Sequence, residues 1–444
     1  MSERLFHPAV APASLLIRGA HALDPREPLD APADLLVRDG LIAEVGAPGA
    51  LSAPDGVEVV EGEGLHLFPG FFDPHVHLRT PGQEHKETLA TGTAAAAAGG
   101  YCGVVAMPNT DPVVDGAPLL RALCEQAQRE ARVPVGFMPA ITRGLAGAEL
   151  TEMAELRDAG ALGFTDDGKP VVAAGMLRRA LQYQRLCGGV LALHEEDPSL
   201  SGRGVMHEGA VSARLGLAGI PSISESTMVA RDSAIAAYEE GRVHFQHLSC
   251  VESVDALAAW KAAGARVSGE ASPHHLTLTD ESVRSLDSRF KMNPPLRTEA
   301  DRQALIAGLR DGTIDCVATD HAPHARHEKE VPFEEAPMGV TGLETAFPVL
   351  YTDLVLPGVL PLALVVERMT AGAALLDLAT PRIAVGEPAN LALVDLEASW
   401  EVGARGYASK SANSCFEGRT LRGVVRLTVA AGAVAHRAAA EVAA

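Results

Sequence analysis

Two histidines separated by one residue, in the stretch Asp73-Pro74-His75-Val76-His77-Leu78-Arg79, constrain this chain more than any other feature. They follow an apolar run that reads as a buried strand. Because side chains of a strand alternate between its two faces, His75 and His77 point to the same side. Two imidazoles that converge at a strand end can hold one divalent metal ion. The pair predicts a metal site, although an ordinary strand end with two histidines would look the same if taken alone.

The middle of the chain alternates apolar, strand-like runs with Ala-rich or amphipathic stretches, which is the pattern of a parallel sheet. Eight strands are expected, at Leu67–Leu78, Gly103–Asn109, Val135–Ile141, Leu162–Asp166, Val190–His194, Val243–His247, Arg266–Ala271 and Cys316–Thr319. Helices are expected between them, at 87–98, 117–130, 225–240, 252–263 and 300–310. This α/β pattern predicts a (β/α)8 TIM-type barrel. A doubly wound open sheet is the alternative, but no Gly-x-Gly-x-x-Gly follows the first strand.

Polar residues stand at the carboxyl ends of most of these expected strands, and this decides for the barrel. They are His75, His77, Asn109, Asp166, Asp167, His194, His247 and Asp320, with His274 and His275 following the seventh strand. Catalytic groups of barrel enzymes lie at this end of the strands. Solvated loops would not place such residues in register around the barrel, so we expect one shared site.

β-Strand patterns also occur at both ends of the chain. Residues 35–45 read as a hairpin that turns at Asp39-Gly40, and further strands are expected at 390–396, 421–429 and 433–436. Each end is too short to bury a core alone. We therefore expect both ends to form one small β domain. The expected division is 1–65 and 386–444 for that domain, and 66–385 for the barrel.

The charge and the cysteines limit the classes of partner and compartment. The net charge is −20 and the pI is near 5.2, which argues against nucleic acid or an anionic membrane as a partner. An anionic substrate would need a local arginine or a metal. The six cysteines are scattered, as in a protein with reduced thiols. With no apolar run of about 18 residues and no cationic leader pattern, the sequence predicts a cytoplasmic protein.

The predicted site combines imidazole and carboxylate ligands, a set that suits Zn²⁺, Co²⁺ or Mn²⁺. Two such ions can share a bridging carboxylate and hydroxide, because metal binding lowers the pKa of water to about 7. A neighbouring aspartate can take a proton from that water and pass it to a leaving nitrogen. This chemistry would hydrolyse, or reversibly close, a cyclic amide.

Taken together, the motifs resemble the dihydroorotase family of the amidohydrolase superfamily, over nearly the whole chain. The motifs that carry the resemblance are DPHVHLRTPGQEHKET (73–88), MPNTDPVVD (107–115), FTDDG (164–168), HEED (194–197), MHEG (206–209), QHLS (246–249), SPHHL (272–276), KMNPPLR (291–297), ATDHAPH (318–324) and GLETAF (342–347). The pairs HxH and TDH alone occur across the superfamily, but the combination is specific. The resemblance implies interconversion of N-carbamoyl-L-aspartate and (S)-dihydroorotate in de novo pyrimidine biosynthesis.

The resemblance also implies a role for each matching residue. One metal ion would be bound by His75, His77 and Asp320, a second by His194 and His247, and both would be bridged by Asp167. Asp320 would also act as general base and acid. Substrate would be held by Arg79, Asn109, Asn293 and His324. The expected cofactor is zinc, as one or two ions, with other divalent metals as alternatives. We expect a homodimer, with aspartate carbamoyltransferase as a candidate partner.

Several alternatives remain open from the sequence. Many relatives bridge the metals with a carboxylated lysine, and Lys169 is the nearest lysine here, but the Asp-Asp-Gly pattern favours Asp167. A related hydantoin, dihydropyrimidine or allantoin hydrolase would not need Arg79 for a substrate carboxylate. A scaffold without catalysis would have lost a ligand, and none is lost. The segment 325–342 could be a disordered surface loop, or a lid or partner-contacting loop at the mouth of the site.

Overall fold

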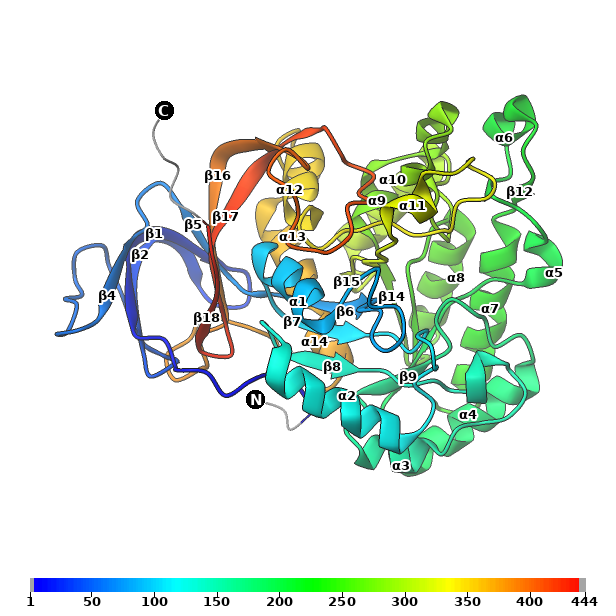
Figure 1. The fold of residues 1–444 in the computed structure, drawn as a ribbon, viewed down its shortest axis with the longest axis horizontal. Coiled ribbons are helices and arrows are strands. Elements are labelled where there is room, and N and C mark those ends of the chain that lie inside the picture. Colours follow the sequence, from blue (N-terminus) through cyan, green and yellow to red (C-terminus); the bar gives the residue numbers. More distant parts are fainter. Residues whose placement is uncertain (1–3, 439–444) are drawn as a thin grey trace.

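Eight parallel strands close into a barrel in the computed structural model, which describes residues 4–438 (Figure 1). The barrel strands are β6 (Phe71–Val76), β7 (Tyr101–Ala106), β8 (Val135–Phe137), β9 (Gly163–Thr165), β10 (Val190–Leu193), β13 (Val243–Phe245), β14 (Val267–Ala271) and β15 (Cys316–Val317). They pair in parallel as β6-β7-β8 and as β9-β10-β13-β14-β15. The expected (β/α)8 barrel is confirmed.

Hydrogen bonds outside the strand ladders join these two groups and close the barrel. Between β8 and β9, the N–H of Leu162 donates to the carbonyl of Phe137 at 2.9 Å. Between β15 and β6, the carboxylate of Asp73 accepts from the N–H and the hydroxyl of Thr319. A buried carboxylate thus replaces part of the ladder at the seam, which explains an acidic residue inside a fully buried strand.

Helices surround the barrel and connect its strands. The main ones are α1 (Leu89–Ala98), α2 (Ala117–Glu130), α3 (Met153–Asp158), α4 (Ala174–Cys187), α7 (Ile223–Tyr238), α8 (Val251–Ala262), α10 (Glu299–Asp311) and α13 (Leu362–Thr370). Shorter elements lie in the connections: α5 (Pro198–Ser201), β11 (Met206–His207), α6 (Ala210–Leu215), β12 (Gly219–Ile220), α9 (Pro273–Thr277), α11 (Arg326–Lys329), α12 (Ala346–Leu350) and α14 (Gly372–Leu375). The five expected helices are confirmed, whereas α3 and α4 were not expected from the sequence.

Both chain ends form one eight-stranded sheet beside the barrel, as expected. Its strands are β1 (Leu15–Asp24), β2 (Leu29–Arg38), β3 (Leu41–Gly46), β4 (Glu58–Glu61), β5 (His66–Pro69), β16 (Leu391–Glu401), β17 (Thr420–Ala430) and β18 (Ala433–Arg437). The order is β18-β17-β16-β5-β1-β2-β3, with β4 beside β1. The turn between β2 and β3 is at Asp39-Gly40, both with positive φ, as a two-residue hairpin turn requires.

Strand β5 joins the two ends of the chain, because it pairs with β1 on one side and with β16 on the other. The expected single strand Leu67–Leu78 was therefore wrong. It is two strands, β5 in the small sheet and β6 in the barrel, separated at Gly70. A Cβ at Gly70 would lie 2.7 Å from the Cβ of Cys102, so the chain can cross between the layers only where no side chain intervenes.

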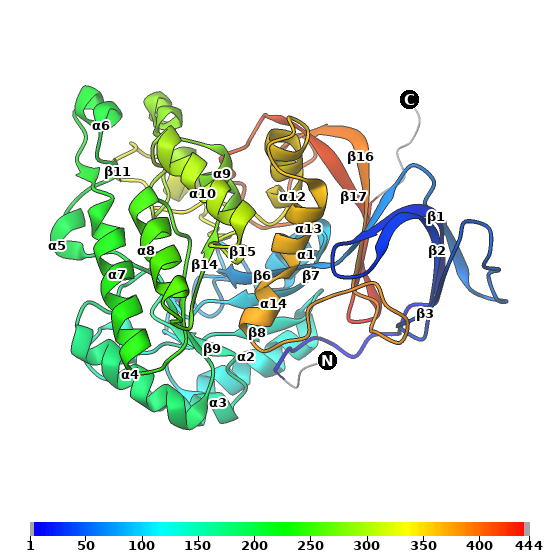
Figure 2. The same cartoon turned by 180° about the vertical axis from the view of Figure 1, so that it is seen from behind.

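Packing between the sheet and the barrel is aromatic and tight. Phe347 of α12 lies 5.6 Å, between ring centroids, from Phe68 of β5 and 5.3 Å from Phe71 of β6, and all three are fully buried. Helix α1 also meets the sheet, where the hydroxyl of Thr428 donates to the carbonyl of Ala97. The alanines of this helix allow that close approach. The views from the two sides show the sheet along one flank of the barrel (Figures 1 and 2).

The segment between β16 and β17, residues 402–419, leaves the small sheet and reaches the barrel (Figure 1, red). Its Ser409 hydroxyl and Lys410 N–H donate to Glu87, and its Ser411 hydroxyl donates to the carbonyl of Lys86. The range 386–444, expected to belong to the small β domain alone, therefore includes a segment that packs on the barrel. Among residues 4–438, no helix is long and apolar enough to span a membrane.

Candidate metal centre and substrate pocket

A cavity of about 220 Å³ opens at the carboxyl ends of the barrel strands. It is lined by His77, Arg79, Asn109, Asp167, Gly168, His194, His247, Asn293, Asp320, Ala322, His324, Met338 and Gly339. Nine of the ten residues that the sequence singled out for the site are in this lining. The tenth, His75, lies directly behind it and contacts two of the lining carboxylates. The barrel thus brings together residues that are up to 249 positions apart in the sequence.

Two overlapping groups of buried side chains could each hold a metal ion. One consists of His75, His77 and Asp320, and the other of His75, Asp167 and His247. In each group, the potential ligand atoms lie within 4.8 Å of one another. His194 joins the second group, because its Nδ1 is 2.9 Å from Nε2 of His247. These contacts bring all six predicted ligands into one centre.

Asp167 lies at the middle of this centre. Its carboxylate oxygens are 3.5 Å from Nε2 of His75, 3.3 Å from Nε2 of His77, 3.7 Å from Nε2 of His247 and 3.9 Å from Nδ1 of His194. One carboxylate that reaches four imidazoles has the position of a bridging ligand.

The neighbouring Asp166, and Lys169, the alternative bridge considered from the sequence, have other positions. Asp166 accepts hydrogen bonds from the N–H groups of Ile141 and Thr142 and therefore holds the backbone. Lys169 is exposed and is not part of the cavity lining. Of the residues near the end of β9, only Asp167 faces the described histidines in this way.

The donors fit a divalent metal ion. Nδ1–H of His75 donates to Glu270 at 2.6 Å, so Nε2 of a neutral His75 carries a lone pair. That buried Nε2 has no hydrogen-bond partner and lies 3.5 Å from an oxygen of Asp167 and from one of Asp320. A divalent ion between this nitrogen and the two carboxylates would give all three groups a partner. The nitrogen and oxygen donors suit zinc and similar ions.

Glu270, in β14, orients the centre and was missed in the sequence. Its carboxylate accepts from Nδ1 of His75, from Nε2 of His244 at 2.9 Å and from the N–H of His247 at 3.2 Å. Burial opposes its ionisation, but His75 and His244 outweigh burial and lower the pKa of Glu270 to about 2. A charged residue within an apolar strand was the available signal, since buried charges need partners.

Asn109 holds one metal-ligand candidate in place. Its Oδ1 accepts from Nδ1 of His77 at 2.8 Å, and its Nδ2 donates to Asp167 at 3.4 Å. Its amide therefore already contacts the centre, in addition to lining the cavity. The amide of Asn293 similarly donates to Glu196 at 2.6 Å, and Glu196 lies 3.4 Å from Nε2 of His194.

Arg79 and His324 both line the cavity, and we call this side of it the cationic wall because Arg79 carries its charge. Nε of Arg79 donates to the carbonyl of Pro323 at 3.1 Å, which is the one hydrogen bond of its side chain within residues 4–438. Burial lowers the pKa of Arg79 to about 10, while Asp320 and Asp167 act in the opposite direction, so the guanidinium stays charged at neutral pH. Burial and the charge of Arg79 lower the pKa of His324 to about 3, which leaves that ring neutral.

Asp320 is the best placed proton acceptor. It is buried and its Oδ1 is 3.0 Å from Nε2 of His77. Burial opposes ionisation of Asp320, but the hydrogen bond with His77 and the charge of His75 hold its pKa well below its usual range. Arg79, His247 and Asp320 all have positive φ, at 56°, 32° and 48°. Such backbone conformations are costly for these residue types and gather at functional sites.

The remaining histidines near the centre have supporting positions. His321 points away from the cavity, because its Nε2 donates to Glu87 and its Nδ1 accepts from the N–H of Gly342. His275 bridges Ser272 and the carbonyl of Pro294. His274 is buried, and its Nε2 has no partner in the part of the chain that the structure describes.

The segment 325–342 contains α11 and contributes to the wall of the cavity, which fits a lid or contact loop at the mouth of the site better than a disordered surface loop. Its Met338 and Gly339 line the cavity. The ammonium of Lys329 is buried within it and donates to the carbonyls of Lys291, Pro337 and Gly339. These three bonds tie α11 to the cavity wall.

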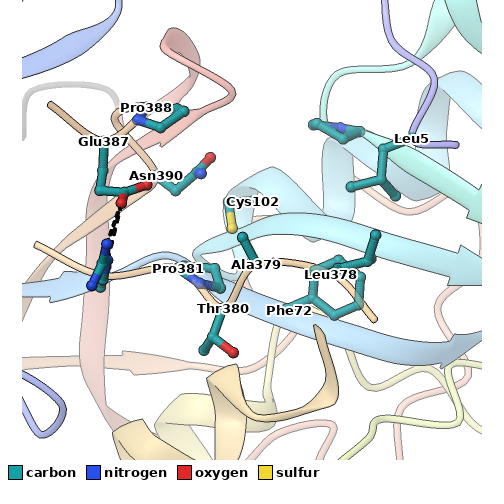
Figure 3. A pocket seen from close by; sticks show the side chains of 12 residues that line it. Leu5, Phe72, Cys102, Leu378, Ala379, Thr380, Pro381, Glu387, Pro388 and Asn390 are labelled. Carbon is teal, nitrogen blue, oxygen red and sulfur yellow. Dashed lines mark hydrogen bonds and ion pairs between the residues drawn. The ribbon is translucent and has the colours of Figure 1, made fainter. Parts of the chain in front are cut away.

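A second cavity, of about 120 Å³, lies near the amino ends of β6 and β7 (Figure 3). Leu5, Phe72, Cys102 and Leu378 form much of its wall. The charged side chains at its edge, Arg382 and Glu387, are bonded to each other at 3.1 Å. This cavity brings no histidine or free carboxylate together and does not carry the chemistry.

Sites built from histidines and aspartates at this end of such a barrel are those of metal-dependent amidohydrolases, and the fold and the site place the chain in that class. A family model described as Dihydro-orotase-like matches residues 64–253. The chain is 44% identical to a dihydroorotase of Desulforapulum autotrophicum, over 95% of this chain and 99% of that protein. It is 45% identical to a dihydroorotase of Pelotomaculum thermopropionicum, over 95% and 98%. The chain belongs to the dihydroorotase family.

Solved structures support the fold. An L-hydantoinase (dihydropyrimidinase) from Arthrobacter aurescens superimposes with a TM-score of 0.85 at 24% identity, over 96% of both chains. A dihydropyrimidinase from Brevibacillus agri gives 0.82 at 22% identity, over 96% and 95%. At these identities the likeness concerns the barrel and the small β domain, and substrate choice rests on the site.

Proposed function

We propose that this chain interconverts (S)-dihydroorotate and N-carbamoyl-L-aspartate through the centre described above. One observation supports this most directly. A buried arginine, Arg79, lies in the same cavity as an aspartate that reaches four imidazoles. Hydrolysis of a cyclic amide needs a metal centre such as the one around that aspartate. Recognition of a carboxylate on the ring needs a cation such as the arginine.

Six residues would hold the metal ions: His75, His77, Asp167, His194, His247 and Asp320. When bound, a divalent ion supplies Lewis acidity and lowers the pKa of water to about 7. Glu270 fixes the ring orientation of His75, and Asn109 that of His77. The two supporting contacts keep Nε2 of both rings directed into the cavity.

Proton transfer is assigned to Asp320. Its carboxylate takes the proton of the attacking water and returns it to the ring nitrogen as the C–N bond breaks. In the direction of ring closure the same carboxylate acts first as base, taking the proton of the attacking carbamoyl nitrogen, and then as acid, returning it to the departing hydroxide. Its low pKa is consistent with a base that is ionised before the reaction begins.

Substrate would be oriented by the cationic wall. The terminal N–H groups of Arg79 would bind the ring carboxylate in a bidentate manner. The neutral His324, whose Nε2–H donates to the carbonyl of Met338 at 2.8 Å, would offer Nδ1 as an acceptor. Asn109 and Asn293 would complete the substrate contacts.

The finer proposals concern the cofactor and the assembly. We propose zinc, as one or two ions, with Asp167 as the bridge instead of a carboxylated lysine. We further propose a cytoplasmic homodimer, with aspartate carbamoyltransferase as a candidate partner.

The test is a substrate comparison with purified protein whose metal content is measured on the same sample. We expect ring opening of dihydroorotate in preference to dihydrouracil and hydantoin. Faster opening of an uncharged ring by metal-loaded protein would overturn the assignment. Inactivity of metal-loaded protein toward all three rings, also with added aspartate carbamoyltransferase, would indicate a scaffold without catalysis.

A further inference from the structure

Asn413, in the middle of the 402–419 segment, connects the small β domain to the wall of the substrate cavity. Its Oδ1 accepts from the N–H of His324 at 3.0 Å. Its Nδ2 donates to the carbonyls of Ala322 and Gly339, both at 3.1 Å. Its own carbonyl accepts from the N–H of Thr341 at 3.3 Å. One residue thus bonds to two parts of the connection that follows β15, before and after α11.

Both parts of that connection contribute residues to the wall of the substrate cavity. Ala322, His324 and Gly339 are in its lining. Pro323 lies between Ala322 and His324, and its carbonyl accepts a hydrogen bond from Nε of Arg79 at 3.1 Å. The backbone fixed by Asn413 therefore supports both side chains of the cationic wall, although Asn413 is not in that lining itself.

An asparagine side chain suits this position chemically. Its amide offers one acceptor and two N–H donors, and all three kinds of contact are used. The residue is buried, with 4% of its surface exposed. Alanine would leave backbone groups unpaired, and aspartate would place a carboxylate oxygen against two carbonyl oxygens.

We propose that Asn413 is a positioning residue for substrate binding, which sets Arg79 and His324 through the backbone of residues 322–324. This proposal rests on the proposed function, because it assumes that these two side chains receive an anionic ring. The anchors of the 402–419 segment at Glu87 and Lys86 contact barrel residues that are not in the cavity lining.

The test compares Asn413→Ala and Asn413→Asp with a matched control, Asn390→Ala. Asn390 belongs to the same part of the chain and accepts one backbone hydrogen bond, from Ala431 at 2.7 Å, but it does not line the substrate cavity. For each protein, KM and kcat for dihydroorotate, metal content and the thermal midpoint are measured. Misplaced binding groups cost up to about 10²-fold. We expect both Asn413 variants to raise KM by about ten- to a hundredfold, with a much smaller change in kcat and with full metal content.

A second arm uses Arg79→Ala as the background. Residues that act through each other are not additive. We expect Asn413→Ala to raise KM much less when Arg79 is already absent.

Three outcomes would overturn the proposal: KM unchanged relative to Asn390→Ala, loss of metal with unchanged KM, or full additivity with Arg79→Ala. Failure of both Asn413 variants to fold, while Asn390→Ala folds, would also overturn it, in favour of a purely structural role. If one variant fails to fold, the other carries the test. Wild-type protein that does not act on dihydroorotate would instead refute the proposed function, so the two failures are distinguishable.

Discussion

At the scale of single residues, the centre depends on pairs in which a second side chain fixes the first. Nδ1 of His75 donates to the carboxylate of Glu270 at 2.6 Å, and Nδ1 of His77 donates to Oδ1 of Asn109 at 2.8 Å. A hydrogen bond at one ring nitrogen decides which lone pair is left for a metal. The chemistry of the six candidate ligands is therefore inseparable from that of their buried partners.

Arg79→Ala should lower kcat/KM for dihydroorotate by at least about 30-fold, since losing one partner of a desolvated charge pair costs about 2–5 kcal/mol. Opening of dihydrouracil, which lacks the carboxylate, should change much less. The measurement is steady-state kinetics on both rings, with Arg79→Lys as a control that keeps the charge. An equal loss on both rings would show that Arg79 supports the structure and does not select the substrate.

Asp320→Asn should reduce kcat by at least about 10²-fold, the usual scale for a lost general base. The fold should be retained, because the amide fills the same space. Metal content must be measured in parallel, since Asp320 is also a candidate ligand. Retained turnover at full metal occupancy would remove Asp320 from proton transfer.

Glu270→Gln should weaken metal binding by about 10–100-fold, the usual effect of altering a partner of a ligand histidine. The carboxylate that accepts from both His75 and His244 would become an amide with one acceptor oxygen. Competition with a chromogenic chelator measures the affinity. Asp315→Asn is the control, because Asp315 also accepts a backbone N–H, from Gly269 at 2.8 Å, but does not contact the centre. Equal affinities of the two variants would contradict the prediction.

At the scale of elements, connections between strands do more than link them. The segment after β15 supplies the cavity wall, and the segment between β16 and β17 holds that wall from outside. Glu87, which precedes α1, joins these parts: it is fully buried and accepts from His321, Ser409 and the N–H of Lys410.

Glu87→Gln should destabilise the protein at pH 7 by about 1–3 kcal/mol, because a buried acceptor of several hydrogen bonds is altered. Burial raises the pKa of Glu87, but its hydrogen bonds outweigh burial and hold it below the ordinary 4.5. Stabilisation by the charge is thus complete above pH 4.5 and is lost as the pH falls through the folded pKa. Denaturation experiments at pH 7 and in mild acid measure the unfolding free energies of Glu87→Gln and wild type. The difference between the two should be smaller in acid.

The control for this prediction is Glu84→Gln, because Glu84 is exposed and accepts only from the nearby N–H of Gly82 among the described side-chain contacts. It should be close to wild type at both pH values. A difference for Glu87→Gln that stays constant with pH would mean that packing, not charge, accounts for the loss.

At the scale of the whole molecule, the centre ties the barrel together. The candidate ligands come from β6, β9, β10, β13 and β15 or the residues directly after them. An ion shared by five strands binds the folded state and not the unfolded one, so binding adds to stability. Without an ion, the carboxylate of Asp167 is surrounded by four imidazoles and the amide of Asn109 in a buried space.

Removal of bound metal by a chelator should lower the thermal midpoint, and zinc should restore it. At a hundredfold excess of metal over its Kd, linkage predicts about 2.7 kcal/mol of stabilisation. Differential scanning fluorimetry measures the shift, and Asp167→Ala, which lacks the central carboxylate, should respond less. A midpoint that is the same with and without metal would contradict the prediction.

The class of fold and the candidate ligands of the metal centre could be predicted from the sequence. Apolar runs that end in histidine or aspartate predict parallel strands with their functional ends together, because strand direction and side-chain alternation are local properties. His75, His77, Asp167, His194, His247 and Asp320 could be named for this reason. The hairpin at Asp39-Gly40 was equally predictable, since its turn conformation depends on two residues only.

The hydrogen-bond partners of these residues could be identified only in the folded structure. Glu270 is an unusual charge within an apolar strand, but its partners His75 and His244 are found only when β14 lies beside β13. Asn413 is one polar residue of a long connection until the 402–419 segment reaches the barrel. The split of the first expected strand at Gly70 likewise depends on two sheets that no local pattern encodes. Hydrogen bonds between residues tens to hundreds of positions apart form because folding brings them together, and local periodicity carries no information about such distances.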